Sequence, residues 1–330
     1  MKTVVIGSGS WGTGLAQALA DKQEDVIIYG LDEAEIKDIN EHHKNTKFFP
    51  DVDLNPQLRA TTDIQVVSDA DVIVLSVPSI AIESVCQQIA PIVTKKVIMI
   101  NTSKGFHPKS NDRMSNVIRG AMPPEKLSSV VSLIGPSHAE EVVIRMLTTI
   151  CAVSQNEADA KKIQHLFSND YLRVYRGNDE VGSEIGVAVK NAIALASGML
   201  SGLGYGDNTR AALITRGLAE MIRFGTALGG RAETFMGLTG MGDLIVTCTS
   251  VHSRNFQAGC EIGKAGNAQI FWDTNTKTVE GVRTAKIVHE IAAEKGIDMP
   301  IVNEIYSVLY EGKSPVQSAR DLMLRDLKPE

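Results

Sequence analysis

Three glycines stand at fixed spacing in the first turn of the chain, directly behind the short apolar run 3–6. Gly7-x-Gly9-x-x-Gly12 follows this predicted strand and opens a helix predicted from Trp11 to about Lys22. In that context the glycines allow a tight turn, a close approach of backbone to ligand, and close packing of helix on strand. The N–H groups at the helix start would face an anion. We therefore predict that Gly7, Gly9 and Gly12 bind the pyrophosphate of a dinucleotide.

Short runs rich in valine and isoleucine alternate with helical patterns through the first half of the chain. The runs are continuously apolar, as in strands buried on both faces, and Pro78 ends the clearest of them because it cannot donate to a ladder. The predicted strands are 3–6, 26–29, 72–77, 97–100, 130–134 and 149–153. This alternation predicts an α/β domain of the Rossmann type with a mostly parallel sheet.

The strand pattern stops after about Arg176, and the rest of the chain has helical periodicity. Glycines predict breaks between these helices near 202–206, 229–230 and 237–242. We predict a dinucleotide-binding Rossmann domain over residues 1–178 and an all-helical substrate and catalytic domain over residues 179–330.

Composition excludes several other classes. A chain of 330 residues with 43% hydrophobic and 22% charged residues has the balance of a folded two-domain protein, and its net charge of −6 argues against a broad nucleic-acid surface. Its four cysteines form no CxxC pair, which predicts reduced thiols and no metal site. We find neither a signal peptide nor an uninterrupted apolar run of about 18 residues, and therefore expect a cytoplasmic protein without a membrane segment.

The end of the second predicted strand bears on the choice of cofactor. Asp32 lies 20 residues after Gly12, where an acid often bonds the adenine ribose, and this favours NAD over NADP. The same residue could instead cap a helix predicted over 33–42. The sequence leaves both interpretations open.

Two later loops follow predicted strands of the same sheet. Lys104 lies in Asn101-Thr102-Ser103-Lys104-Gly105, and Ser137 lies in Gly135-Pro136-Ser137-His138-Ala139. Ligands of open α/β folds bind at the carboxyl ends of the strands, so we expect both loops to face the nicotinamide.

A lysine and an asparagine interrupt an otherwise apolar helix in the second half. Small and apolar residues surround Lys190 and Asn191 on every side, which predicts that Lys190 is largely buried. Burying an unpaired ammonium is costly, so it needs a carboxylate or an anionic ligand. Asp243, in a glycine-rich apolar segment, is the natural partner. We therefore predict proton transfer by Lys190, with a structural ion pair as the alternative.

Ser253, Arg254 and Asn255 come ten residues after Asp243 and start another predicted helix, with Ser253 as its N-cap. Helix N-terminus, guanidinium, hydroxyl and amide together suit a phosphate group. An ordinary surface cap is the alternative.

Together these segments resemble the bacterial NAD(P)-dependent glycerol-3-phosphate dehydrogenase family. The resemblance runs the length of the chain, through Gly-x-Gly-Ser-Trp-Gly-Thr at 7–13, Ser-Val-Pro at 76–78, Thr-Ser-Lys-Gly at 102–105, Gly-Pro-Ser-His-Ala at 135–139, Val-Lys-Asn at 189–191, Gly-Asp-Leu at 242–244, Ser-Arg-Asn at 253–255 and Val-Glu-Gly at 279–281. It implies reversible oxidation of sn-glycerol 3-phosphate to dihydroxyacetone phosphate, used in reverse to supply phospholipid synthesis.

The resemblance also implies residue roles. Lys190 is the implied proton acceptor, and the implied substrate-binding residues are Lys104, Gly135, Ser137, Lys190, Asp243, Ser253, Arg254 and Asn255. The implied cofactor contacts are Ser10, Trp11, Lys104, Ala139, Arg254, Thr278 and Glu280. The substrate is then a small phosphorylated molecule and the cofactor NAD or NADP.

Three positions depart from the family pattern. Leu31 stands where an arginine that would meet the extra phosphate of NADP is common, which again favours NAD. Phe48 replaces a usual tyrosine and removes a hydroxyl. Thr278 replaces a small apolar residue at a backbone contact.

Other functions compete with this interpretation. β-Hydroxyacid dehydrogenases of the Rossmann-plus-helical type also use a helical lysine, but with an asparagine one turn later, where this chain has Ala194. A non-catalytic NADH sensor would share the fold and would have no need of Lys190. We interpret His138 and His252 as structural. The small-residue helices around 185–228 predict a homodimer.

Overall fold

Eight strands form one sheet within the part of the chain that the computed structural model describes, residues 1–327 and 329. They are β1 (Thr3–Ile6), β2 (Val26–Tyr29), β3 (Arg59–Thr61), β4 (Val72–Leu75), β5 (Val97–Asn101), β6 (Leu127–Ile134), β7 (Thr148–Val153) and β8 (Leu172–Gly177). Their order is β3-β2-β1-β4-β5-β6-β7-β8, and every neighbouring pair is parallel except β6 and β7. The strand order changes direction between β1 and β4. Ligands of open parallel sheets bind at such a point.

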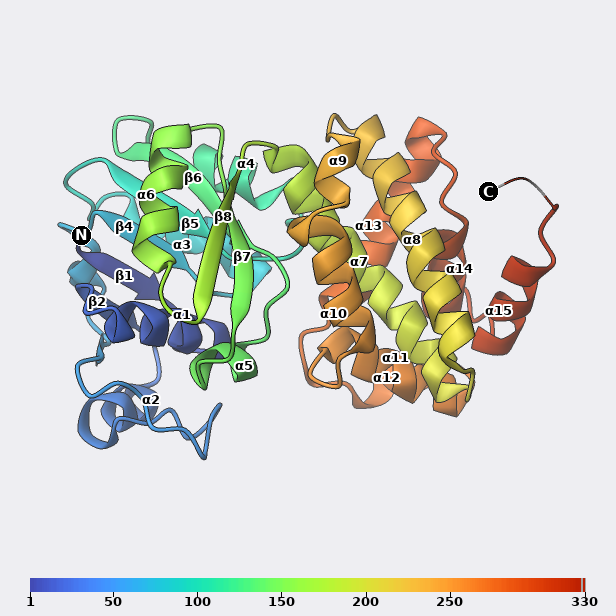
Figure 1. Cartoon of the computed structure of the whole chain (residues 1–330), viewed down its shortest axis with the longest axis horizontal. Coiled ribbons are helices and arrows are strands. Elements are labelled where there is room, and N and C mark those ends of the chain that lie inside the picture. Colours follow the sequence, from blue (N-terminus) through green and yellow to red (C-terminus); the bar gives the residue numbers. More distant parts are fainter. Residues whose placement is uncertain (328, 330) are drawn as a thin grey trace. The chain divides into compact units, whose positions relative to one another are not determined.

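Helices cover both faces of this sheet (Figure 1). Val5 belongs to the core cluster that includes Leu15 of α1 (Ser10–Asp21), together with residues of α5 (Ala139–Val143) and α6 (Glu157–Phe167). Its neighbours Val4 and Ile6 belong to the opposite cluster, with Ile82 of α3 (Ile82–Ile89) and residues of α4 (Met114–Ala121). Successive strand residues point to opposite faces, so a doubly covered sheet needs continuously apolar strands.

The chain divides into two units, Met1–Glu180 and Val181–Glu330, which we call unit 1 and unit 2. Unit 1 contains the sheet. The described residues of unit 2 contain helices and no strand: α7 (Glu180–Gly202), whose first residue belongs to unit 1, α8 (Asp207–Ala227), α9 (Ala232–Phe235), α10 (Asp243–Thr249), α11 (Arg254–Ala265), α12 (Gln269–Thr274), α13 (Glu280–Lys295), α14 (Pro300–Tyr310) and α15 (Pro315–Met323).

Glycines let α7 and α11 pack backbone against backbone. A Cβ atom added at Gly198 of α7 would lie 2.1 Å from the carbonyl oxygen of Phe256, and one at Gly259 of α11 would lie 2.1 Å from that of Leu195. Both distances are far below a possible contact. The small residues of α7 therefore serve packing inside unit 2.

In the described part of the chain, α7 alone has the length and composition of a membrane-spanning helix, with a mean hydropathy of 1.3 over its most apolar 18 residues. However, 83% of that window is buried inside the structure. Buried core helices satisfy the same criteria, so these two properties alone do not identify a membrane span.

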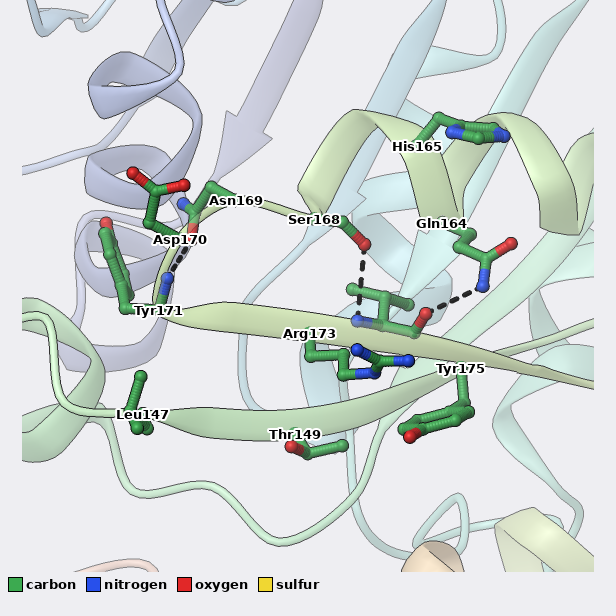
Figure 2. Close-up of a pocket in the computed structure, with 11 residues that line it drawn as sticks. Leu147, Thr149, Gln164, His165, Ser168, Asn169, Asp170, Tyr171, Arg173 and Tyr175 are labelled. Carbon is green, nitrogen blue, oxygen red and sulfur yellow. Dashed lines mark hydrogen bonds between the residues drawn. The ribbon is translucent and has the colours of Figure 1, made fainter.

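The edge strand β8 borders an open hollow of about 590 Å³ in unit 1 (Figure 2). Gln164 donates a hydrogen bond to the carbonyl oxygen of Val174 over 2.8 Å, and the Val174 N–H donates to Ser168 Oγ over 3.3 Å. The Leu172 N–H donates to Asn169 Oδ1 over 2.7 Å, and the Asn169 N–H donates to the carbonyl oxygen of Leu172 over 2.9 Å. These bonds occupy backbone groups that an edge strand would otherwise offer to another strand. No residue predicted to bind cofactor or substrate lines the hollow.

The six strands predicted from sequence are present, and the α/β fold class is confirmed. The predicted strand 72–77 is two residues too long, since β4 ends at Leu75. β3 and β8 were not predicted. The break predicted near 237–242 lies at its start: the chain turns at residues 236–237, after α9, and the π-helical turn Leu238–Gly242 then leads directly into α10.

Candidate functional site

The glycine turn of unit 1 has no room for side chains at two of its three glycines. Gly7 adopts φ +116°, and a Cβ atom there would lie 2.4 Å from the carbonyl oxygen of Ser76. A Cβ atom on Gly12 would lie 2.0 Å from the carbonyl oxygen of Gly7. At Gly9, by contrast, a Cβ atom would meet nothing within 4 Å. The turn therefore packs tightly against the protein backbone at Gly7 and Gly12, and it faces open space at Gly9.

This open position fits the pyrophosphate of a dinucleotide. Gly9 precedes the first turn of α1 without capping it by a side chain, so the helix start can accept an anion. Trp11, a predicted cofactor contact, has a buried indole N–H with no hydrogen-bond partner in the structure. Ser10 begins α1 beside it.

The structure brings together the two predicted loops at the carboxyl ends of β5 and β6. Lys104 donates to the carbonyl oxygen of Gly135 over 2.7 Å and to Ser137 Oγ over 3.2 Å. Ala139 is buried and begins α5. A side chain amine thus lies at the edge of the sheet where a ligand is expected.

Asp32 is the N-cap of the short helix α2 (Glu33–Lys37) and accepts hydrogen bonds from the N–H groups of Ala34 and Glu35. The capping interpretation is confirmed. Its contact with ribose stays a prediction. Its second carboxylate oxygen lies 3.3 Å from Lys47 Nζ, while Leu31 is 85% exposed.

In unit 2, Lys190 and Asp243 form the predicted buried ion pair. Lys190 is 4% exposed and Asp243 is fully buried, with 3.1 Å between Nζ and Oδ1. The Lys190 ammonium also donates to Thr247 Oγ1 over 2.6 Å, and that hydroxyl donates to the carbonyl oxygen of Asp243 over 2.6 Å. The result is an ammonium held from two sides in a site with little water.

Asn191 and Asn255 connect three helices of unit 2. Asn255 of α11 donates to Asn191 Oδ1 of α7 over 3.0 Å and accepts from the N–H of Gly281 in α13 over 2.8 Å. The side chain of Asn255 therefore connects the start of α11 to α7 and α13. Ser253 caps α11 by accepting from the N–H of Phe256, and Arg254 is exposed at the helix start.

The two remaining predicted contacts are Thr278 and Glu280, and neither is buried. Thr278 is exposed and Glu280 starts α13 at intermediate exposure. His138 is the residue before α5, and His252 is exposed in the turn before α11. In the described part of the chain, no group of three or more His, Cys, Asp or Glu side chains could hold a metal ion, and the four cysteines are free.

Sequence reasoning missed Thr247 and the pair Glu35 and Lys47. Thr247 stands four residues after Asp243, so helical periodicity puts both on one face, and that signal could have identified it. Glu35 and Lys47 meet through tertiary structure, which the sequence pattern does not encode.

A glycine turn on a doubly wound sheet, followed by a helical unit with a buried lysine–aspartate pair, defines a dinucleotide-dependent dehydrogenase of the Rossmann class. The models of the NAD-dependent glycerol-3-phosphate dehydrogenase N-terminus and C-terminus match residues 2–160 and 179–320. The chain belongs to the NAD-dependent glycerol-3-phosphate dehydrogenase family.

Two relatives and one solved structure agree with this assignment. The glycerol-3-phosphate dehydrogenases [NAD(P)+] of Enterococcus faecalis and Lysinibacillus sphaericus are each 46% identical over all 330 residues, which cover 97% and 98% of those proteins. The crystal structure of glycerol-3-phosphate dehydrogenase from Coxiella burnetii superimposes with a TM-score of 0.90 at 30% identity, covering 98% of this chain and 99% of that one. The predicted family, enzyme class and use of NAD or NADP are confirmed, and the β-hydroxyacid dehydrogenase and sensor alternatives find no support.

Proposed function

We propose that Lys190 is the proton donor and acceptor in the family's reaction, the NAD(P)-dependent interconversion of sn-glycerol 3-phosphate and dihydroxyacetone phosphate. The buried cluster of Lys190, Asp243 and Thr247 is the observation that carries this proposal. A desolvated, oriented amine is the type of group that general acid–base catalysis requires.

Reduction of the ketone adds a hydride at C2 and a proton at the C2 oxygen. Bound NAD(P)H supplies the hydride. The Lys190 ammonium donates the proton and is left neutral, and in the oxidative direction the neutral amine accepts it. Asp243, 3.1 Å from Lys190 Nζ, and the hydroxyl of Thr247 hold the amine in one direction.

We assign the substrate phosphate to Arg254, Ser253, Asn255 and the start of α11. The exposed guanidinium and the helix N-terminus supply positive charge, and α11 is long enough, at twelve residues, to have a well-formed start. Lys104, Gly135 and Ser137 are the proposed substrate contacts of unit 1, and Lys104 and Arg254 are also proposed to contact the cofactor. Ser10, Trp11, Ala139, Thr278 and Glu280 complete the proposed cofactor contacts.

The proposal extends to the setting of the enzyme. We assign dinucleotide binding to residues 1–178 and substrate binding and catalysis to residues 179–330. We further propose a cytoplasmic homodimer, and size-exclusion chromatography can test its oligomeric state. The enzyme would supply glycerol 3-phosphate for phospholipid synthesis, which complementation of a glycerol 3-phosphate auxotroph can test.

The experiment on the catalytic role compares Lys190→Ala with wild type in steady-state reduction of dihydroxyacetone phosphate. Loss of the proton donor should lower kcat by about 10²–10⁴-fold, while the Kd for NADH, measured without substrate, changes little. Lys286→Ala removes an exposed lysine of α13 and should leave kcat unchanged. A wild-type kcat in Lys190→Ala would show that the amine is not the proton donor.

A further inference from the structure

Three charged side chains gather beyond the end of β2 in unit 1. Lys47 Nζ lies 2.5 Å from Glu35 Oε1 and 3.3 Å from Asp32 Oδ2. The other oxygen of Glu35 accepts a hydrogen bond from Ser8, the residue between the first two glycines of the turn. The charged cluster of Asp32, Glu35 and Lys47 is therefore attached to the turn proposed to hold the pyrophosphate.

Two further contacts fix the segment that carries Lys47. Asn45 is fully buried and donates to the carbonyl oxygen of Ser8 over 2.8 Å and to Thr13 Oγ1 over 2.9 Å. Gly30 allows Ser8 to approach β2, because a Cβ atom at Gly30 would lie 2.6 Å from Ser8 Oγ. Lys47 is thus held in place by the fold around the turn.

Two members of the cluster, Asp32 and Lys47, are stabilised in their charged forms. Hydrogen bonds from the N–H of Ala34, and next from Lys47, hold the pKa of Asp32 below its ordinary value. Hydrogen bonds to Glu35, and next to Asp32, raise the pKa of Lys47. With two carboxylates and one ammonium, the cluster has a net charge of about −1 at neutral pH.

We propose that this cluster selects NADH over NADPH. In Rossmann folds an acid after the second strand accepts a hydrogen bond from the ribose 2′-hydroxyl, and Asp32, whose side chain is 45% exposed, can do so. The 2′-phosphate of NADPH, with nearly two negative charges, would instead meet a net negative cluster. Lys47 cannot compensate, since its ammonium already serves both carboxylates.

This inference rests on the proposed function, because it assumes that the dinucleotide lies in the glycine turn. Leu31 stands where an arginine is common in the family, so the positive charge that would attract the 2′-phosphate of NADPH is missing at this position. The cluster adds a repulsion against the 2′-phosphate to the contact that Asp32 offers the 2′-hydroxyl. Specific binding sites commonly combine contacts to one ligand with repulsion of its competitor.

The test is a direct measurement of Kd for NADH and for NADPH by titration calorimetry, without the second substrate. Wild type should bind NADH at least about tenfold more tightly, and Asp32→Asn should lower the ratio Kd(NADPH)/Kd(NADH) by about tenfold. Asparagine keeps the helix cap, so the variant retains the local fold. Lys47→Gln should raise the ratio, because it leaves the carboxylates without their cation.

Asp53→Asn is the matched control. Asp53 is an exposed acid paired with Lys44 outside the cluster, and its loss changes the net charge by the same amount. It should leave the ratio unchanged. Equal or tighter binding of NADPH by wild type, or equal ratios in Asp32→Asn and Asp53→Asn, would overturn the inference. Failure of folded wild type to bind either nucleotide would overturn the proposed function and this inference with it.

Discussion

The glycine turn of unit 1 is made of backbone, whereas the Lys190 cluster of unit 2 is made of buried charge. At Gly7 and Gly12 the turn depends on the absence of side-chain atoms, since a Cβ atom would overlap backbone oxygens. The cluster depends on the presence of Lys190 and Asp243 together, each almost without access to water. Substitutions in the glycine turn should therefore destabilise the protein through steric overlap. Substitutions in the Lys190 cluster should destabilise it by leaving a buried charge without a partner. Variants that separate these two causes test the comparison.

The largest effect is expected for Asp243→Ala. It leaves the Lys190 ammonium without its carboxylate in a site that is 4% exposed, and breaking a buried pair in this way costs about 3–5 kcal/mol. Urea denaturation should show that loss in the free energy of unfolding. The double variant Lys190→Met with Asp243→Ala should regain most of it, because no charge then remains buried.

Asp207→Ala provides the exposed counterpart. Asp207 is paired with Arg210 but is 90% exposed, so its removal should cost less than about 1 kcal/mol. Equal losses in Asp243→Ala and Asp207→Ala would show that burial does not govern the ion pair of unit 2.

The turn of unit 1 should respond to a single methyl group. Gly12→Ala places a Cβ atom against the carbonyl oxygen of Gly7 and should lower the free energy of unfolding by about 3 kcal/mol, the upper end for overpacking. Gly9→Ala meets open space, so it should retain wild-type stability in the same denaturation experiment but weaken NADH binding. Full stability and NADH affinity in Gly12→Ala would contradict the steric account.

Glu220 extends the comparison to a buried carboxyl group that accepts hydrogen bonds from backbone N–H groups. It is 2% exposed on α8, and the N–H groups of Ile301 and Val302 at the start of α14 donate to its two oxygens over 2.7 and 3.2 Å. Burial raises the pKa of Glu220 to about 7 despite these bonds. The folded state therefore binds a proton in a pH range where the unfolded state, with a pKa of about 4.5, has lost it.

This difference fixes the sign of the pH dependence. The contribution of Glu220 to stability is full below about pH 4.5 and is lost as the pH rises through about 7. Between those values wild type should lose roughly 2–3 kcal/mol more than Glu220→Gln, which cannot titrate. Denaturation at a series of pH values measures the difference, and parallel curves for the two proteins would refute it.

The turn could be predicted from sequence because six consecutive residues determine it, whereas β3 and β8 could not be found by searching for apolar runs. β8 is an edge strand in which buried Leu172 and Val174 alternate with exposed residues, and β3 has only three residues. The Lys190–Asp243 pair was predictable because a buried amine needs a carboxylate. The contacts of Glu35 with Ser8 and Lys47 were not, since they depend on how segment 43–49 folds back on the turn.

The smallest effect is expected for Thr247, which positions Lys190. Thr247→Val removes one hydrogen bond to the ammonium and should cost about 1 kcal/mol of stability, while kcat falls roughly tenfold because the amine loses its fixed direction. Thr247→Ser retains the hydroxyl and should restore kcat. A change in stability alone, with kcat unaltered in Thr247→Val, would reduce this hydroxyl to a packing role and leave Asp243 as the group that orients the amine.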